Sequence, residues 1–184
     1  KIAGIKMCES YNRQYVESHG IDYRCIMPTN LYGPGDNYEP VNSHVIPGLI
    51  TRFHKAKINN LSEVKVWGTG LPKREFLYVD DMARASIHLM NISKRTYYKN
   101  VSPNQSFINV GSGKELTIKE LAKLIKETVG FKGEIKFDPS KQDGTPRKLL
   151  DSQLIHNLKF KPEIDLKEGL IKTYNEYLKI NENN

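Results

Sequence analysis

The pattern of apolar and polar residues predicts a protein of the α/β or α+β class. Segments in which apolar residues recur every three or four positions, as in helices, alternate with short runs that are typical of strands. No internal repeat and no linker divides the 184 residues. We therefore expect one domain, or one and a half.

The first two elements are expected to be a helix and a strand. Residues 2–19 carry apolar side chains at intervals of three and four, and Gly20 is well placed to end the helix. The run 22–27 is predicted as a strand that Pro28 ends. The chain opens directly with a helix, and no G-x-G-x-x-G fingerprint follows a strand, so only part of a dinucleotide-binding sheet is predicted.

The next segment is predicted as a loop followed by a second helix. Residues 28–40 are rich in Gly, Pro and Asn, which favour turns. The helix should run from Ser43 or His44 to about Ala56. Pro47 fits in its first turn, where the missing N–H costs little.

Two short strands and a helix are expected in the middle of the chain. The strands cover 64–67 and 74–79 and are joined by a Gly-rich turn. Asp80 or Asp81 can cap the helix that follows. The polar stretch 94–104 is predicted as a loop.

The clearest helix of the sequence starts at Thr117. Thr117 and Glu120 match the capping box, in which each side chain bonds the backbone N–H of the other residue. Gly130 is placed to end this helix. Before it, 107–110 is predicted as a strand closed by the glycines of 111–113.

The last part of the chain is predicted to hold one more strand and two helices. The strand covers 134–137, and the basic, turn-rich stretch 141–148 follows as a loop. A short helix is expected around 152–157. Asp165 is expected to cap the final helix, and the tail 181–184 is expected to fray.

The formal charge of +7, from 28 basic and 21 acidic residues, permits an anionic partner. The basic residues are scattered, whereas a stripe for nucleic acid would be longer and interleaved with aromatic residues, so no nucleic-acid partner is predicted. No window holds about 18 consecutive apolar residues, and no membrane span is predicted. Cys8 and Cys25 are expected to be reduced thiols of a cytoplasmic protein, and no metal site is predicted.

The segment 27–34 is the first candidate for chemistry, because α/β proteins bind ligands at the carboxyl ends of strands. Asn30 and Tyr32 within it either contact a ligand or are simply turn residues. His44 lies where the second helix is expected to begin, a position that disfavours the protonated imidazole. A neutral imidazole can exchange protons near pH 7; the alternative is a surface or helix-capping histidine.

Two cationic features could bind phosphate. Arg74 lies between a Gly-rich turn and a strand, where a guanidinium could grip a diphosphate with two hydrogen bonds. The alternative is a salt bridge with Glu75, or plain exposure. Lys141, Arg147 and Lys148 surround a rigid turn and form a compact cationic loop, for which solvated charge is the default interpretation.

Together these blocks resemble a known family, the GDP-L-fucose synthases of the extended short-chain dehydrogenase/reductase family, over essentially the whole chain. The segments that carry the resemblance are, in order, Lys1-Ile-Ala-Gly-Ile-Lys6, Pro28-Thr-Asn-Leu-Tyr-Gly-Pro34, Asn42-Ser-His-Val-Ile-Pro47, Trp67-Gly-Thr-Gly70, Arg74-Glu-Phe-Leu-Tyr-Val-Asp-Asp81, Asn109-Val-Gly-Ser-Gly113 and Asp143-Gly-Thr-Pro-Arg-Lys-Leu-Leu-Asp151. The block that starts at Arg74 is general to extended members. The blocks around His44 and Asp143 are more particular to fucose synthases.

The resemblance implies the C-terminal part of an α/β enzyme: a partial Rossmann-type sheet, holding about 1–30 and 105–113, plus a smaller α/β substrate-binding domain. Lys1 resembles the Lys of a Tyr-x-x-x-Lys motif, so the catalytic Tyr and the Gly-rich NADP loop would lie upstream, and this chain alone would be inactive. An apparent small insertion at 16–20 departs from the family pattern. Full-length members resemble one another in forming homodimers, and the helix that begins at Lys1 would take part.

The activity implied by the resemblance converts GDP-4-keto-6-deoxy-D-mannose to GDP-L-fucose, by epimerising C3 and C5 and then reducing the C4 ketone with NADPH. Lys1 would lower the pKa of the catalytic Tyr, and His44 would act as acid/base. The residues implied to contact NADP(H) are Lys1, Pro28, Leu31 and His44. Those implied to line the GDP-sugar site are Asn30, Arg52, Trp67, Arg74 and Lys141, with Arg74 on the diphosphate.

Three other interpretations stay open at this point. The protein could be another nucleotide-sugar epimerase or dehydratase of the same superfamily, which recognition of guanine rather than uracil would separate. It could be a non-catalytic module that binds sugar nucleotides. A nucleic-acid binder is the weakest of the three, and it predicts steeply salt-dependent binding.

Overall fold

The computed structural model describes residues 1–39, 42–102 and 106–182. Within these ranges the helices are α1 (Ile2–His19), α2 (Val45–Ile58), α3 (Val79–Asn91), α4 (Lys94–Asn100), α5 (Ile118–Val129), α6 (Gln153–Asn157) and α7 (Leu166–Glu182). The strands are β1 (Cys25–Pro28), β2 (Asn30–Tyr32), β3 (Glu63–Trp67), β4 (Lys73–Tyr78), β5 (Phe107–Val110), β6 (Glu115–Thr117), β7 (Glu134–Asp138) and β8 (Arg147–Lys148). Mixed helices and parallel strand pairs confirm the predicted α/β class.

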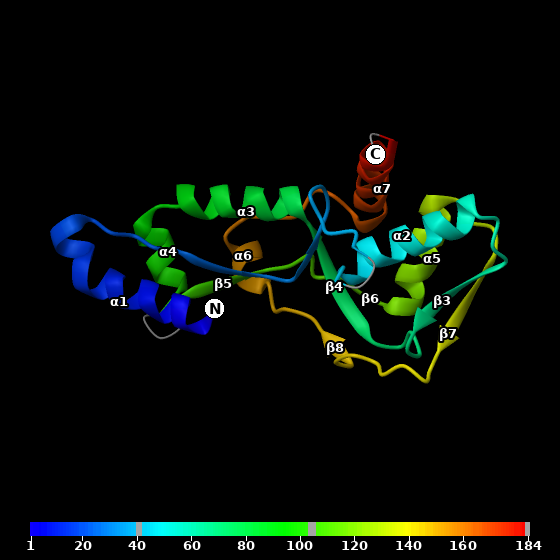
Figure 1. The fold of residues 1–184 in the computed structure, drawn as a ribbon. Helices are drawn as coiled ribbons and strands as arrows, with labels where there is room; N and C mark the ends of the chain where they lie inside the picture. Colours follow the sequence, from blue (N-terminus) through cyan, green and yellow to red (C-terminus); the bar gives the residue numbers. More distant parts are fainter. Residues whose placement is uncertain (40–41, 103–105, 183–184) are drawn as a thin grey trace.

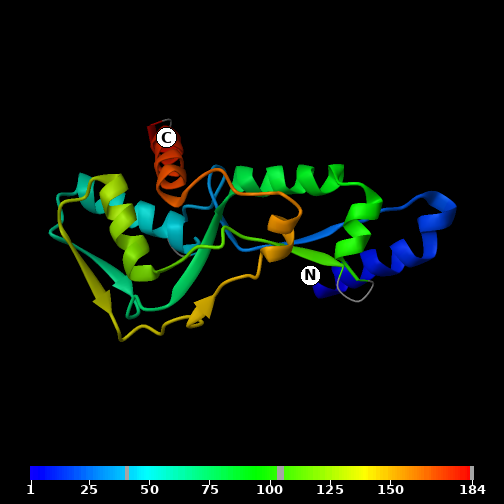
Figure 2. The same cartoon turned by 180° about the vertical axis from the view of Figure 1, so that it is seen from behind.

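The molecule is elongated, with one packed region at each end (Figure 1). At one end β1 and β5 pair in parallel, from Cys25 opposite Phe107 to Pro28 opposite Val110. Helix α3 lies on one side of this pair and α1 on the other, and both views agree on this (Figures 1 and 2). The buried core of this end consists of Leu77, Ala85, Leu89, Tyr97, Ile108, Val110, Ile155, Leu158 and Phe160.

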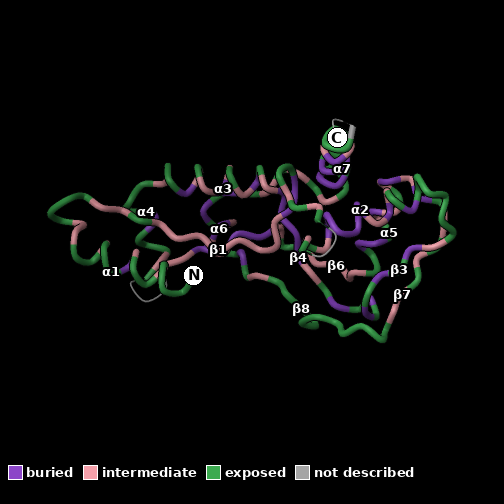
Figure 3. The backbone as a smooth tube through the Cα atoms, viewed as in Figure 1, coloured by how far each residue is buried: buried purple, intermediate pink, exposed green. Residues whose placement is uncertain are grey.

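At the other end β3 and β7 pair in parallel, and α2, α5 and α7 pack together beside them (Figure 2). Their apolar faces form a second core. In Figure 3 stretches of these helices are coloured as buried. Its fully or nearly fully buried members include Ile46, Ile50, Phe53, Leu121, Ile125 and Leu170.

Strand β4 connects the two ends. It pairs with β2 and β8 in parallel and with β6 in antiparallel orientation. Because successive side chains of a strand point to opposite faces, Phe76 and Tyr78 enter the core around α2, whereas Leu77 enters the core around α3. One strand therefore holds both cores in a fixed relation, and the pocket described below lies beside it.

The local signals for helix ends are confirmed. Thr117 Oγ1 accepts from Glu120 N at 3.1 Å, and Glu120 Oε2 accepts from Thr117 N at 2.7 Å, which completes the capping box of α5. Gly130 ends the helix in the left-handed region at φ 74°. Asp165 Oδ1 accepts from Glu168 N at 2.9 Å at the start of α7.

The first strand begins later than the sequence predicts. Tyr23 lies in the predicted run 22–27, but its N–H and C=O are both bonded to the side-chain amide of Asn12 on α1, at 2.9 and 2.8 Å. These backbone groups are thus not available to a strand partner. Strand β1 starts at Cys25 and includes Pro28.

The predicted loops contain short elements. Strand β2 lies within the predicted loop 28–40 and β8 within 141–148; two or three residues are too few to show an alternating pattern. Helix α4 occupies most of the predicted loop 94–104. Its signals are local, since Ser93 Oγ accepts from Thr96 N at 3.1 Å as N-cap and Tyr97 is buried.

The predicted cap of α3 is wrong. The helix begins after Tyr78 with no side-chain cap. Asp81 is fully buried instead. It accepts hydrogen bonds from the backbone N–H of Glu163 and of Ile164, each at 3.0 Å, and it forms an ion pair with Arg84 at 2.7 Å. The two backbone donors come from a segment more than 80 positions away, so no local pattern in the sequence indicates them.

Some predictions fall on residues outside the described ranges, namely the end of the first predicted loop at 40, residues 103–105 and the final residues 183–184. The tail is not frayed from residue 181 as predicted, because α7 continues through Asn181, whose Nδ2 donates to Tyr177 O at 2.7 Å.

Candidate functional site

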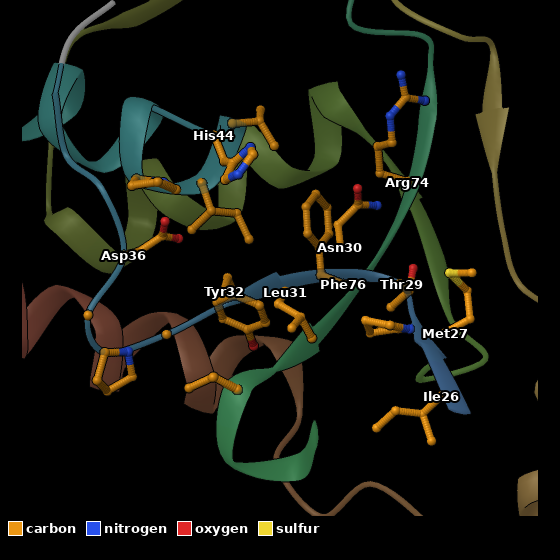
Figure 4. A pocket seen from close by; sticks show the side chains of 18 of the residues that line it. Ile26, Met27, Thr29, Asn30, Leu31, Tyr32, Asp36, His44, Arg74 and Phe76 are labelled. Carbon is orange, nitrogen blue, oxygen red and sulfur yellow. The ribbon is translucent and has the colours of Figure 1, made fainter. Parts of the chain in front are cut away.

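A pocket of about 620 Å³ lies between the two packed regions of the molecule. Figure 4 shows this pocket from close by. Most of its wall comes from the continuous segment 26–36. The remaining lining residues are Lys1, Ile5, His44, Val45, Ile46, Pro47, Arg74, Phe76 and Val79. The pocket therefore brings together the start of α1, the end of β1, the start of α2 and the middle of β4.

Hydrogen bonds fix the first residues of the segment that follows β1 and lines this pocket. Thr29 N donates to Val110 O at 3.0 Å, which keeps the chain beside β5 as β1 ends. Asn30 Nδ2 donates to Glu75 O at 2.8 Å, and this bond fixes the side-chain amide. Asn30 is thus both a strand residue, paired with Phe76, and a pocket residue, rather than a turn residue.

His44 is the N-cap residue of α2, with extended backbone angles of φ −67° and ψ 169°, and its side chain makes no capping hydrogen bond. The residue is exposed and lines the pocket. In Figure 4 Asn30 and Phe76 extend from β2 and β4 toward the side on which His44 lies. The helix-capping alternative is therefore wrong, whereas an exposed imidazole in the pocket wall fits both a surface histidine and a group that faces a ligand.

Arg74 lies farther along β4 at the edge of the pocket (Figure 4). Its Nη1 donates to Lys73 O at 2.7 Å, and it forms no salt bridge with Glu75. The two side chains point to opposite faces of the strand, and Glu75 is fully buried while Arg74 is partly exposed. The salt-bridge alternative is wrong, and the guanidinium can contact an anion.

Three of the predicted site residues do not line this pocket. The guanidinium carbon of Arg52 lies 4.7 Å from the centre of the Trp67 ring, and burial lowers the pKa of Arg52. Trp67 is 61% exposed, so this stacked pair presents an aromatic face to solvent. Lys141 is exposed on the basic loop 141–148.

Hydrogen bonds nevertheless tie the basic loop to the turn that follows Trp67. Thr69 N donates to Asp143 Oδ1 at 2.9 Å, and Thr69 Oγ1 donates to Asp143 Oδ2 at 2.6 Å. The Trp67 turn and the loop that carries Lys141 thus form one surface beside Arg74. The structure brings Lys1, Pro28, Asn30, Leu31, His44 and Arg74 together in the pocket and leaves the other three on this adjoining surface.

Asp36 and Phe76 are among the lining residues that sequence reasoning missed. Asp36 lines the pocket with one carboxylate oxygen buried and without a hydrogen-bond partner among the described residues. Phe76 forms part of the wall beside Asn30 (Figure 4). Asp36 resembles an ordinary turn residue in sequence, and Phe76 resembles any core aromatic, so neither carried a signal of its own.

The described part of the chain contains neither a helix suited to span a membrane nor a cluster of metal-ligating side chains. None of its helices combines the length and the apolar composition that crossing a membrane requires. Nowhere in residues 1–39, 42–102 and 106–182 do three or more His, Cys, Asp and Glu side chains gather as metal ligands would.

The sequence of residues 1–101 matches the NAD dependent epimerase/dehydratase family. The chain belongs to that family. Among curated relatives, it is 57% identical over 178 residues to GDP-L-fucose synthase of Escherichia coli strain K12, covering 97% of this chain and 54% of the relative. The chain spans about half the length of the curated relatives it matches.

The fold is also similar to those of solved nucleotide-sugar enzymes. A GDP-6-OMe-4-keto-L-xylo-heptose reductase from C. jejuni aligns with a TM-score of 0.85 and 34% identity, covering 98% of this chain and 59% of that one. A GDP-L-fucose synthetase from Naegleria fowleri, bound to NADP, aligns with a TM-score of 0.81 and 28% identity, covering 98% and 55%. These relatives confirm the predicted α/β fold of an extended short-chain dehydrogenase, of which this chain spans about half.

Proposed function

We propose that this chain forms the substrate-binding portion of a GDP-L-fucose synthase, which converts GDP-4-keto-6-deoxy-D-mannose to GDP-L-fucose with NADPH. The observation that carries the proposal is the convergence of Lys1, His44 and Arg74 on one pocket. An acid/base group and an anion-binding group in one cavity fit epimerisation of a sugar that is attached to a diphosphate. The 57% identity to the E. coli enzyme supports the choice of substrate.

Epimerisation next to a ketone requires that a proton leaves a ring carbon and that a proton returns on the opposite face. His44 can perform one of these transfers, because its imidazole is not engaged as a helix cap and lies in the pocket wall. A positioned acid/base group typically contributes ~10²–10⁴-fold to the rate. Asn30, held by Glu75 O, can orient the sugar by hydrogen bonds.

The pocket also fits the nicotinamide end of NADP(H), which when bound supplies the hydride for reduction at C4. Lys1, Pro28, Leu31 and His44 all line it, so a cation, two apolar side chains and an imidazole meet there. Lys1 would bond the nicotinamide ribose and act on the catalytic Tyr. In the family, that Tyr and the Gly-rich loop precede the Lys that Lys1 resembles. We therefore expect this chain alone to bind nucleotide sugar without turnover.

The GDP portion is proposed to extend from the pocket across the adjoining surface. Arg74 would grip the diphosphate with two parallel N–H donors. The exposed Trp67 ring, with Arg52 stacked on it, offers a platform for the guanine base. Lys141 on the neighbouring loop adds a further positive charge near the phosphates.

Residues 1–30 and 105–113 are proposed to belong to the sheet domain, which the parallel pairing of β1 with β5 supports. A cytoplasmic homodimer is proposed for the full-length enzyme. In support, Cys8 and Cys25 are free thiols. Ile2, Met7 and Tyr11 expose 75%, 60% and 46% of their surface along α1, as an interface helix would.

The test joins this chain to the remaining N-terminal part of the E. coli relative and measures NADPH oxidation with GDP-4-keto-6-deoxymannose in deuterated water. We expect NADPH consumption with deuterium at C3 and C5. His44→Gln should abolish deuterium entry. The matched control is His54→Gln on the same helix, whose ring bonds Tyr174 OH at 3.0 Å away from the pocket, and it should leave the reaction unchanged.

Two other results would change the assignment. NADPH consumption without deuterium entry would indicate a reductase of a GDP-4-keto sugar, a candidate that the C. jejuni structure favours. Binding of GDP-sugar without any turnover in the fusion would favour the non-catalytic binding module.

A further inference from the structure

We propose that Glu75 is a positioning residue: its buried carboxylate anchors the basic loop 141–148 beside the pocket and so sets the affinity for a nucleoside diphosphate that it does not touch. The identity of the ligand rests on the function proposed above. The anchoring itself rests on hydrogen bonds that do not depend on any ligand.

The carboxylate of Glu75 is fully buried and is held by backbone groups of two separate segments. Oε1 accepts from Gly113 N at 2.7 Å, and Oε2 accepts from Leu150 N at 3.1 Å. Among the described residues none of the ion pairs involves this carboxylate, so the two N–H groups offset its desolvation. Gly111 permits the approach, since a Cβ there would lie 2.4 Å from Oε1.

The backbone of the same residue holds the pocket wall. Glu75 O accepts from Asn30 Nδ2 at 2.8 Å and from Thr29 Oγ1 at 3.3 Å. One residue thus connects the segment after β1 with the segments that contain Gly113 and Leu150, while its neighbour Arg74 lines the pocket.

Leu150 is where Glu75 restrains the basic loop. It follows β8, whose residues Arg147 and Lys148 pair with Lys73 and Arg74 of β4. This pairing covers only two residues and is therefore weak by itself. The loop is also attached by the two bonds from Thr69 to Asp143, by the bond from Lys73 N to Pro146 O at 2.9 Å and by the ion pair of Arg147 with Glu115 at 2.7 Å. Arg147 and its ion pair are exposed, whereas the Leu150 bond goes to a buried carboxylate, so loss of the Leu150 bond would loosen the end of the loop that lies next to Arg74.

Glutamine cannot replace this carboxylate, although it has nearly the same size. A carboxylate offers two acceptor oxygens, whereas an amide offers one oxygen and an NH₂ group. In Glu75→Gln one of the two backbone donors must face another donor, whichever way the amide is turned. The substitution removes one anchor and leaves the volume of the core unchanged.

Asp81 provides a matched control. It too is fully buried and accepts from two backbone N–H groups, those of Glu163 and Ile164, each at 3.0 Å. It lies on α3 and does not line the pocket. Asp81→Asn should therefore lower stability in the same way without affecting the loop.

The experiment measures GDP binding to the chain by the fluorescence of Trp67, the only tryptophan of the sequence, at a temperature where circular dichroism shows each variant folded. We expect Glu75→Gln to raise the Kd about tenfold, as the loss of one well-formed hydrogen bond that supports the binding surface would. Asp81→Asn should keep the wild-type Kd despite a lower melting temperature. Glu75→Asp, which keeps both oxygens on a shorter side chain, should lie between them and serves as the second variant if Glu75→Gln does not fold.

An unchanged Kd in Glu75→Gln, or an equal increase in Asp81→Asn, would overturn the proposal. If the wild-type chain does not bind GDP, the proposed function is contradicted, and amide hydrogen exchange decides the positioning role. Exchange should then accelerate at Gly113 or at Leu150 in Glu75→Gln, whichever faces the amide NH₂ group, and at Glu163 or at Ile164 in Asp81→Asn. Wild-type exchange rates at Gly113 and Leu150 in Glu75→Gln would refute the anchor without reference to any ligand.

Discussion

Alanine substitutions at two helical glycines should have opposite effects on stability, because only one of the glycines has a neighbour in the way. Gly4 lies in α1, and a Cβ added there would meet nothing within 4 Å. Gly169 lies in α7, and a Cβ there would lie 2.1 Å from the hydroxyl oxygen and 2.8 Å from Cζ of Tyr32. Tyr32 is only 3% exposed and its ring packs against Phe76 and Tyr78, so the ring has to shift against these neighbours to make room.

The magnitudes follow from the balance of helix propensity and packing. Alanine in a helix interior is favoured over glycine by about 1 kcal/mol, so Gly4→Ala should stabilise the protein by about 0.5–1 kcal/mol. Overpacking of a core costs about 1–3 kcal/mol, and an approach of 2.1 Å places Gly169→Ala at the upper end. After subtraction of the propensity gain, Gly169→Ala should destabilise by about 2 kcal/mol.

Urea unfolding followed by far-ultraviolet circular dichroism measures both variants. The fluorescence of Trp67 on β3 additionally reports on the end of the molecule that contains α7. Tyr32→Phe removes the atom nearest to the added methyl group, so it should recover part of the loss in the Gly169→Ala background. The reasoning is refuted if Gly169→Ala unfolds at the wild-type urea concentration or above it.

Two further predictions concern a helix cap and a thiol. Thr117→Ala removes the bond that Oγ1 accepts from Glu120 N and should cost about 1 kcal/mol in thermal or urea unfolding, whereas Thr117→Ser should retain most of it; equal losses for both would contradict the cap. Burial and a hydrogen bond to Cys8 raise the pKa of Cys25 from 9.0 to about 11. Because the folded pKa is raised, the linked stability is present below pH 9 and declines as the pH rises toward 11. Cys25 should alkylate far more slowly in the native than in the urea-unfolded protein at pH 8, and equal rates of iodoacetamide labelling, read by mass spectrometry in Cys8→Ser, would contradict this.

The sequence by itself determined the elements whose signals are local. The capping box at Thr117, the acidic cap at Asp165 and the apolar spacing of α1 and α2 each act within one or two helical turns, and the structure has these elements where the sequence predicts them. The position of the pocket was also predictable. In α/β proteins ligands bind at the carboxyl ends of parallel strands, and the residues at such an end are those that directly follow the strand in the sequence. The segment 27–34, which the pattern after the first strand predicted as a ligand segment, lines the pocket.

Only the tertiary structure decided which of the candidate residues share a cavity. Arg52, Trp67 and Lys141 match the family pattern as well as Asn30 and Arg74 do, yet they lie on the adjoining surface. Their placement depends on where β3 and the basic loop stand relative to β4, which long-range pairings set.

The same reason explains the roles of Asp81 and Glu75. Each carboxylate accepts hydrogen bonds from backbone groups far away in sequence, namely Glu163 and Ile164 for Asp81 and Gly113 and Leu150 for Glu75. Backbone N–H groups are present at every residue except proline, so such a bond leaves no trace in residue type. The sequence determined the long helices and the family resemblance, whereas the partners of the buried carboxylates were decided by chain segments that meet only in the folded protein.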